Sequence, residues 1–199
     1  MKSEIIINKQ NNQVIKICNS PKMFKKELFI YKKKLPFIPR LIDHDGKNTL
    51  ILEYIDGIPI IDLAQPNFEK ITELMLKFHA LESKGDKCLC HSDNNPKNYL
   101  YSNGDYFMLD FSEWDYDYPE SDIIHFLLFW ASEYEYTKFK FVFEQVINTY
   151  RQKKIINPLE WQMILPEIIE KFDYRRKKFG KTKTHPHILQ NRELMREIL

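Results

Sequence analysis

The chain has 199 residues, of which 43% are hydrophobic and 14% aromatic, and its formal net charge is +2. This composition excludes a disordered protein, and the length suits one ordinary domain or two small lobes. The longest apolar run, residues 123–131, is interrupted by a histidine and is much shorter than the roughly 20 residues of a membrane-spanning helix. We therefore expect no membrane contact. The three cysteines and the lack of a visible secretory signal predict a reduced, cytoplasmic location.

Two short β-branched runs begin the chain. Residues 5–8 and 14–17 flank a polar turn at residues 9–13, which predicts a β-hairpin. Alternation along the second strand puts Lys16 on the same face as Val14.

A helix is predicted next. Ser20 can cap its first turn, and Pro21 fits the first helical position. Glu27 lies on this helix. By themselves, Lys16 and Glu27 could both be surface charges, which contribute little as a pair.

The remaining pattern predicts a division of the chain near residue 55. Before it the sequence favours strand, strand, helix, strand and strand, and after Asn67 it is mostly helical. We expect an N-terminal lobe at residues 1–55 and a C-terminal lobe at residues 56–199. Helices are expected at residues 68–82, 120–135, 138–153, 158–172 and 187–198.

A loop after residue 90 carries the strongest chemical signal. Asp93 and Asn98 lie in the run His91-Ser92-Asp93-Asn94-Asn95-Pro96-Lys97-Asn98, and Asp110 follows after a predicted hairpin with Asn-Gly at its turn. Such a hairpin brings Asn98 and Asp110 together at its open end. In phosphoryl transfer one carboxylate accepts a hydroxyl proton, while an Asn and a second Asp bind magnesium. We assign these roles to Asp93, Asn98 and Asp110.

Several segments, in the same order along the chain, resemble the aminoglycoside phosphotransferase and choline kinase branch of the protein-kinase-like fold. The matching segments are residues 14–17, 24–28, 38–42, 50–57, 76–81, 91–98, 110–112 and 119–123. The resemblance implies a two-lobed α+β fold with a small, truncated, β-rich N-lobe and a larger, mainly helical C-lobe.

The resemblance also implies a nucleotide site. Lys16 would contact the phosphates of ATP, and Glu27 would hold Lys16 in place. The adenine would meet backbone groups near Glu53 and Ile55. The implied cofactors are ATP and Mg2+, and His91 would brace the catalytic loop rather than donate a proton.

Two departures from the kinase pattern matter. None of the five glycines precedes the strand of Lys16, so the glycine-rich turn that covers the phosphates is predicted to be missing. Ser112 stands where protein kinases have Gly, and Pro119 follows Asp110 too closely for an activation segment. We therefore expect a small-molecule hydroxyl as the acceptor. The alternatives are a pseudokinase-like binding module and a kinase of protein Ser or Thr residues.

The segment of residues 113–122 alternates acids with aromatic residues. It could line a pocket for a cationic acceptor such as an amino sugar or amino alcohol. Alternatively, Glu120, Ser121 and Asp122 cap and charge the start of the next helix.

Two other features carry less weight. Cys88 and Cys90 lie close to His91, but with no second cysteine pair a β-strand explains the spacing better than zinc does. The basic run of residues 175–178 fits a solvated helix end, so nucleic acid is not the expected partner. The oligomeric state stays open.

Overall fold

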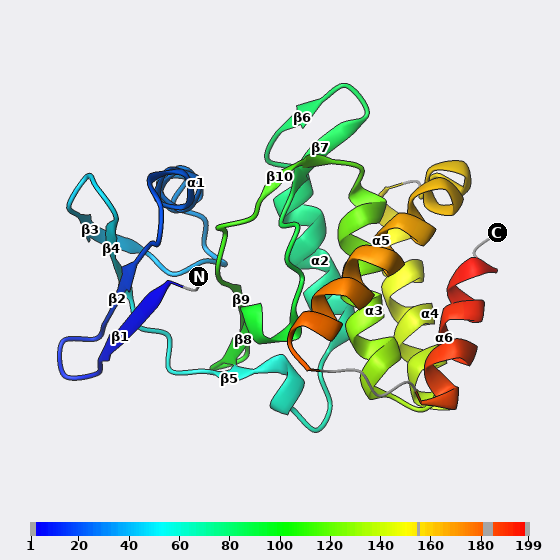
Figure 1. Ribbon diagram of the computed structural model, residues 1–199. Helices are drawn as coiled ribbons and strands as arrows, with labels where there is room; N and C mark the ends of the chain where they lie inside the picture. Colours follow the sequence, from blue (N-terminus) through cyan, green and yellow to red (C-terminus); the bar gives the residue numbers. More distant parts are fainter. Residues whose placement is uncertain (1–2, 155, 181–184, 198–199) are drawn as a thin grey trace. The chain divides into compact units, whose positions relative to one another are not determined.

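The computed structural model describes residues 3–154, 156–180 and 185–197, which form two compact units. Unit 1 comprises Met1–Pro66 and Pro96–Trp114, and unit 2 comprises Asn67–Asn95 and Asp115–Leu199. The α+β class is confirmed, because unit 1 is rich in strands and unit 2 is mainly helical (Figure 1). The predicted functional division at residue 55 stays a prediction.

A four-stranded antiparallel sheet begins unit 1. Its strands are β1 (Glu4–Asn8), β2 (Gln13–Ile17), β3 (Leu41–His44) and β4 (Thr49–Glu53), in the order β1-β2-β4-β3. The predicted first hairpin is confirmed, with Ile6 opposite Ile15 and Lys16 opposite Ile5. Lys16 also pairs with Leu50 of β4, so the lysine lies in a central strand of the sheet.

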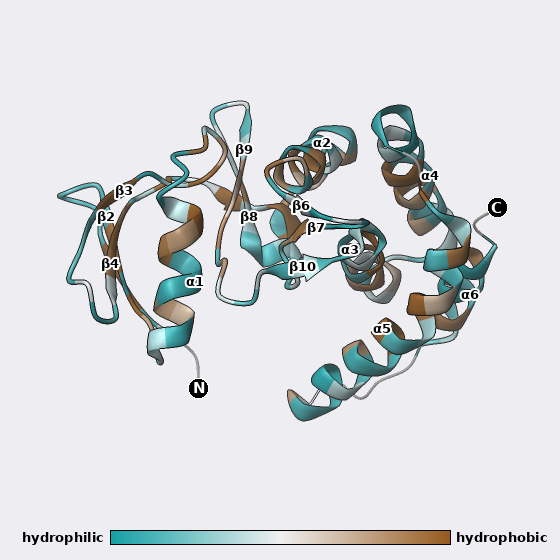
Figure 2. Ribbon diagram, turned by 90° about the horizontal axis from the view of Figure 1, so that it is seen from above, coloured by the Kyte–Doolittle hydropathy of each residue, from teal (hydrophilic) through white to brown (hydrophobic). Residues whose placement is uncertain are grey.

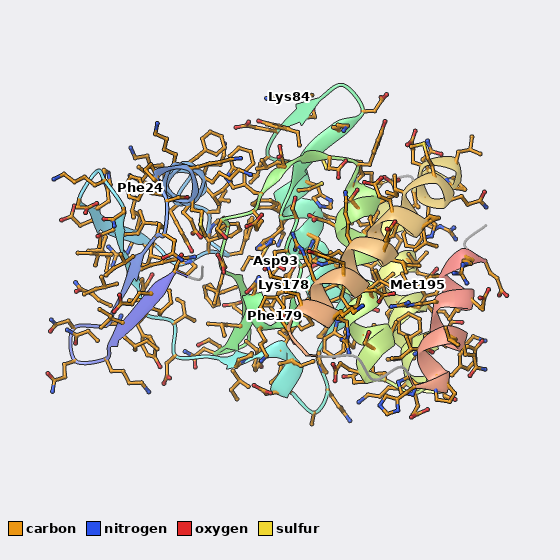
Figure 3. All side chains as sticks on the ribbon, in the orientation of Figure 1. Phe24, Lys84, Asp93, Lys178, Phe179 and Met195 are labelled. Atoms are coloured by element: carbon orange, nitrogen blue, oxygen red, sulfur yellow. The ribbon has the colours of Figure 1, made fainter. Side chains whose placement is uncertain are left out.

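Helix α1 (Pro21–Tyr31) begins where the sequence predicts it. The Ser20 side chain accepts a hydrogen bond from the backbone N–H of Met23 at 3.2 Å, which satisfies one of the unpaired donors of the first turn. Phe24, labelled on this helix in Figure 3, is buried, as is Glu27. Apolar and polar bands alternate along α1 (Figure 2).

A second sheet of unit 1 contains β5 (Ile58–Pro59), β8 (Tyr99–Ser102) and β9 (Asp105–Met108), in the order β5-β8-β9. Short 3-10 turns at η1 (Ile60–Asp62) and η2 (Pro96–Asn98) precede β8. The predicted β8–β9 hairpin is confirmed. Asn103 and Gly104 at its turn have φ angles of 51° and 93°, the left-handed conformation that a two-residue hairpin turn requires.

Unit 2 joins a small sheet to a group of helices. The strands are β6 (Ser83–Lys84), β7 (Lys87–Cys90) and β10 (Asp115–Asp117), in the order β10-β7-β6. The helices are α2 (Phe68–His79), α3 (Pro119–Glu133), α4 (Tyr136–Lys153), α5 (Pro158–Lys178) and α6 (Pro186–Arg196). Helix α3 is buried along most of its length and packs against α4, α5 and α6, so it forms the centre of this unit.

Two helix ends differ from the prediction by more than two residues. Helix α2 stops at His79 rather than at Glu82, because the Glu82 carbonyl accepts the backbone N–H of Leu89 at 3.0 Å and so joins the small sheet. Helix α5 continues to Lys178 rather than ending at Phe172. Its last turn is basic, and cations are favourable at a helix C-terminus.

The predicted last helix is present as α6, but its expected end at Ile198 lies outside the described residues. Within the described part of the chain, no helix has the length and apolar content needed to cross a bilayer.

Candidate active site

Three charged side chains from distant parts of the sequence meet inside unit 1. Lys16 of β2 forms ion pairs with Glu27 of α1 and with Asp110, which follows β9. The Lys16 Nζ to Asp110 Oδ1 distance is 2.8 Å, although the two residues are 94 positions apart. The expected Lys16–Glu27 ion pair is therefore present, and Asp110 joins it.

Burial gives this cluster unusual electrostatics. Lys16 and Glu27 are almost completely buried. Burial, reinforced by the negative charge of Asp110, raises the pKa of Glu27 to about 7 despite the opposing charge of Lys16. Burial also opposes ionisation of Asp110, but the charge and hydrogen bond of Lys16 outweigh it and hold the pKa of Asp110 well below its usual range. Asp110 is thus the carboxylate that stays ionised near neutral pH.

The β8–β9 hairpin positions the two predicted metal ligands. The backbone carbonyl of Asn98 accepts the N–H of Leu109 at 2.8 Å, so Asn98 lies beside the residue that precedes Asp110. Asp110 has a φ of 61°, a left-handed conformation that is uncommon for a residue with a side chain and that often marks a functional site. Carboxylate and amide oxygens are the donors that Mg2+ prefers, so this donor set fits the ion.

The residues after Asp110 pack onto helix α1. Phe111 is buried and makes an edge contact with Tyr31 at 5.5 Å between ring centroids. The Trp114 indole donates to the Lys26 carbonyl at 2.8 Å and stacks on Phe29. Trp114 therefore packs on α1, and the cationic pocket considered for residues 113–122 stays a prediction.

The predicted adenine-binding segment follows β4. The backbone N–H of Glu53 donates to Arg40 at 2.9 Å, and that of Tyr54 donates to Asn12 at 3.0 Å, so these two donors are already engaged. Glu53 and Ile55 line a shallow pocket of 380 Å³ within unit 1. Their role in nucleotide binding stays a prediction.

Asp93 lies in unit 2, in the loop that follows β7 (Figure 3). Its neighbour Ser92 has a φ of 64°, a second left-handed residue beside a predicted functional group. The Asp93 N–H donates to the His91 ring at 3.3 Å, and the Asp93 carbonyl accepts the N–H of Asn95 at 2.8 Å. The contact to a fully buried His91 agrees with its expected role as a brace for the loop.

Asp122 of helix α3 fixes the start of this loop. Its carboxylate accepts the backbone N–H of His91 at 2.7 Å and that of Ser92 at 2.8 Å. The same buried carboxylate lies 2.9 Å from Nε2 of His79, at the end of α2. Because it has several donors in a dry environment, Asp122 holds the loop backbone rigidly, and these bonds lower its pKa although burial opposes them.

A second imidazole holds the middle of the loop. The Asn94 N–H donates to Nδ1 of His125 at 3.1 Å, and the buried Asn94 side chain donates to the Asp122 carbonyl at 3.3 Å. Burial lowers the pKa of His125 to about 4, so its ring stays neutral and keeps the acceptor that Asn94 needs. Asp93 is therefore carried by a loop whose backbone is bonded on either side.

Sequence reasoning missed the part played by Asp122 and His125. Glu120 and Asp122 do lie in the first turn of α3, as predicted, but no side chain caps this helix. The Asp122 carboxylate instead turns back to the loop after β7, and Glu120 accepts the N–H of Asn157 at 2.8 Å. The sequence does contain a signal for Asp122, because Asp122 lies in residues 119–123, one of the segments that resemble the kinase-like family.

No protein-family model matches the chain, and no curated protein matches it. The fold, by contrast, matches solved structures. Choline kinase LicA from Streptococcus pneumoniae aligns with a TM-score of 0.63 and 12% identity, over 98% of this chain and 88% of that chain.

Two further structures give the same result. A choline/ethanolamine kinase family protein from Mesorhizobium loti has a TM-score of 0.61 and 11% identity, over 98% of this chain and 90% of its own. The ADP-bound aminoglycoside phosphotransferase APH(2'')-Ib has a TM-score of 0.60 and 13% identity, over 99% and 89% of the two chains. The TM-scores show a shared fold, and at identities of 11–13% they show the fold alone, so the predicted resemblance is confirmed at that level.

Proposed function

We propose that this protein transfers the γ-phosphate of ATP to a hydroxyl group of a small molecule. The observation that carries the proposal is the buried cluster of Lys16, Glu27 and Asp110. A lysine that is fixed by one carboxylate, beside a second carboxylate that stays ionised, is the arrangement that nucleotide phosphates and their metal ion require.

Each residue has a defined task in this proposal. Asn98 and Asp110 would hold Mg2+, which supplies charge neutralisation at the phosphate oxygens when it is bound. Lys16 contacts phosphate oxygens while Glu27 keeps its ammonium group oriented. Glu53 and Ile55 provide backbone groups for the adenine. Asp93 orients the acceptor hydroxyl and accepts its proton as the oxygen attacks phosphorus.

The solved structures with this fold support the substrate class. One neighbour is a choline kinase, and others are aminoglycoside phosphotransferases, one with gentamicin and one with ADP. Another is an amicoumacin kinase in complex with AMP-PNP and Ca2+. We therefore propose amino alcohols and amino sugars as the first acceptors to screen.

One observation favours a second function. The turn between β1 and β2, at residues 9–12, contains no glycine, and Asn12 takes its left-handed position with a φ of 54°. Side chains in this turn hinder close approach of the backbone to phosphates. The alternative is thus a module that binds nucleotide weakly, or not at all, and acts through a partner.

The variant Asp93→Asn tests the proposal. Because Asn cannot accept the hydroxyl proton, phosphorylation of the acceptor should fall by roughly 100-fold or more, within the range for loss of a general base. ATP binding, followed by calorimetry, should be retained. Asp86→Asn, in the exposed turn between β6 and β7, is the matched control and should match the parent.

Equal turnover by the parent and Asp93→Asn would contradict the assignment of Asp93. A parent that binds ATP but phosphorylates no amino alcohol or amino sugar, and instead labels a mixture of proteins, would identify a protein kinase.

A further inference from the structure

Three soft or borderline metal-binding side chains lie together inside unit 2, and none of them is a residue assigned to phosphoryl transfer. They are Cys88 and Cys90 of β7 and His79 at the end of α2, and all three are buried. Their ligand atoms lie within 4.8 Å of one another. The sequence directs attention to His91, next to Cys90, but the fold supplies His79 instead.

The spacing of the sulfur atoms suits a tetrahedral ion. Cys88 and Cys90 are two residues apart on strand β7, so both side chains lie on the same face. Their Sγ atoms are 3.7 Å apart. Two thiolates bound to zinc at 2.3 Å in tetrahedral geometry are about 3.8 Å apart. The observed pair therefore needs almost no adjustment to share one ion.

Two hydrogen-bond partners orient the histidine ring. Its Nε2 lies 2.9 Å from the carboxylate of Asp122, which already accepts backbone N–H groups, so Nε2 is the donor. In the neutral imidazole Nδ1 is then an acceptor, and it lies 2.9 Å from the hydroxyl of Tyr150. A carboxylate that orients an imidazole in this way is a recurring partner of zinc-binding histidines.

We propose that Cys88, Cys90 and Nδ1 of His79 form a Zn2+ site. The complex of Zn2+ with two thiolates and a neutral imidazole has no net charge, which limits the cost of burying it. Soft thiolates select zinc over the magnesium of the nucleotide site. On binding, the two thiols release their protons to solvent, so Cys90 loses its S–H hydrogen bonds to the carbonyls of Asp117 and Tyr118. Tyr150 also gives up its hydrogen bond to His79.

The site has an access route and a consequence for the loop. His79 and Cys88 both line a pocket of 970 Å³ within unit 2, from which the ion can enter and a water molecule can complete the tetrahedron. Through His79 and Asp122 the ion is linked to the backbone of His91 and Ser92. Bound zinc should therefore stabilise the loop that carries Asp93.

The first test needs no variant. The reduced, chelator-treated full-length chain is titrated with Co2+, whose spectrum reports ligand type and geometry. We expect one equivalent to give intense visible bands of a tetrahedral ion and a near-ultraviolet thiolate-to-cobalt band, both abolished by one equivalent of Zn2+. If the parent shows no thiolate band, the Cys88–Cys90 contact is a hydrogen bond between thiols, and the proposal is wrong.

Variants then assign the ligands. Zinc affinity, measured by competition with a chromophoric chelator, should fall in Cys88→Ser and in Cys90→Ser by more than the roughly 10–100-fold that loss of an outer-shell partner costs. Cys18→Ser is the matched control, because Cys18 is a buried free thiol of unit 1. Tyr150→Phe keeps all three ligands and should bind zinc at least as tightly as the parent.

Thermal unfolding supplies an independent readout. Zinc should raise the unfolding midpoint of the parent and of Cys18→Ser, but not that of Cys88→Ser. An equal loss of affinity in Cys18→Ser and Cys88→Ser, or an equal zinc shift in the parent and Cys88→Ser, would overturn the assignment. Neither readout depends on phosphotransferase activity, so failure of the proposed function leaves this test intact.

Discussion

In unit 1 an ammonium group holds two carboxylates, whereas in unit 2 a carboxylate holds backbone N–H groups and an imidazole. Lys16 binds Glu27 and Asp110 through side chains, which can exchange partners when a ligand arrives. Asp122 accepts the backbone N–H groups of His91 and Ser92, and backbone groups cannot rotate to new partners as side chains can. The first arrangement keeps charges available for ligands, while the second keeps a loop in one conformation.

The two arrangements also respond to pH in opposite directions. Glu27 has its pKa raised to about 7 by burial, so the folded state holds its proton more tightly than the unfolded chain does. His125 has its pKa lowered to about 4 by burial, so there the unfolded chain binds the proton more tightly. By linkage, rising pH weakens the Glu27 region and strengthens the His125 region between about pH 4 and 7.

Removing the charge of Asp122 should have the largest effect. Asp122→Asn places an amide N–H where the carboxylate accepted a backbone donor, inside a fully buried site. We expect a loss of about 3 kcal/mol or more in the free energy of unfolding of unit 2. Urea denaturation followed by the fluorescence of Trp130 and Trp161 measures it.

The matched control for Asp122→Asn is Asp117→Asn. Asp117 is half-exposed and lies 3.6 Å from Lys87, so its loss should cost less than about 1 kcal/mol. Similar costs in both variants would show that the Asp122 bonds do not hold the loop.

Glu27→Gln should change how unit 1 responds to pH. In the parent, stability should fall by about 3 kcal/mol at most as pH rises from 4.5 through 7, because the folded state must release the Glu27 proton. Gln cannot ionise, so the variant should lack this slope. Amide hydrogen exchange in β2 and β4 at several pH values measures it, and an unchanged slope in Glu27→Gln would contradict the account.

His125→Gln should change how unit 2 responds to pH. In the parent, unit 2 should lose stability as pH falls from 6.5 toward 4, because the unfolded chain takes up the His125 proton first. Gln retains an acceptor for the Asn94 N–H but does not titrate, so the slope should flatten. Urea midpoints at pH 7 and pH 5 for parent and variant are the measurement, and equal differences between the two midpoints would exclude His125 as the cause.

The smallest effect is expected from a hairpin glycine. Gly104→Ala should cost about 1 kcal/mol, because alanine is strained at a φ of 93°. Gly85→Ala, in the β6–β7 turn at a φ of 62°, is the matched control with similar strain in unit 2. Only Gly104→Ala should weaken magnesium-dependent nucleotide binding, since its hairpin carries Asn98 and Asp110. Equal nucleotide binding by the two variants would show that the β8–β9 hairpin does not position the nucleotide site.

Local chemistry explains what could be predicted from the sequence. The Asn103-Gly104 turn and the Ser20 cap each depend on neighbouring residues, and both predictions are confirmed. The ion pair of Lys16 with Glu27 was expected through the family resemblance rather than from local pattern.

Contacts between distant segments could not be predicted in the same way. Neither the bond of Asp110 to Lys16 nor that of Asp122 to the loop backbone can be recognised from the spacing of residues in the sequence. Each joins groups that only the complete fold brings together. For the same reason the sequence does not indicate that His79 lies beside Cys88 and Cys90. Helix α5 runs past its predicted end because its basic residues belong to the last helical turn, where cations are favourable, rather than to the segment after the helix.

Calorimetric titration of ATP, with and without magnesium, on the parent and on Asp110→Asn tests whether Lys16, Glu27 and Asp110 form a nucleotide site. The parent should bind ATP more tightly with magnesium, and Asp110→Asn should lose most of this gain while its fold is retained. A parent that binds no ATP, or a variant with the same magnesium dependence as the parent, would contradict the assignment of Lys16, Glu27 and Asp110 as a nucleotide site.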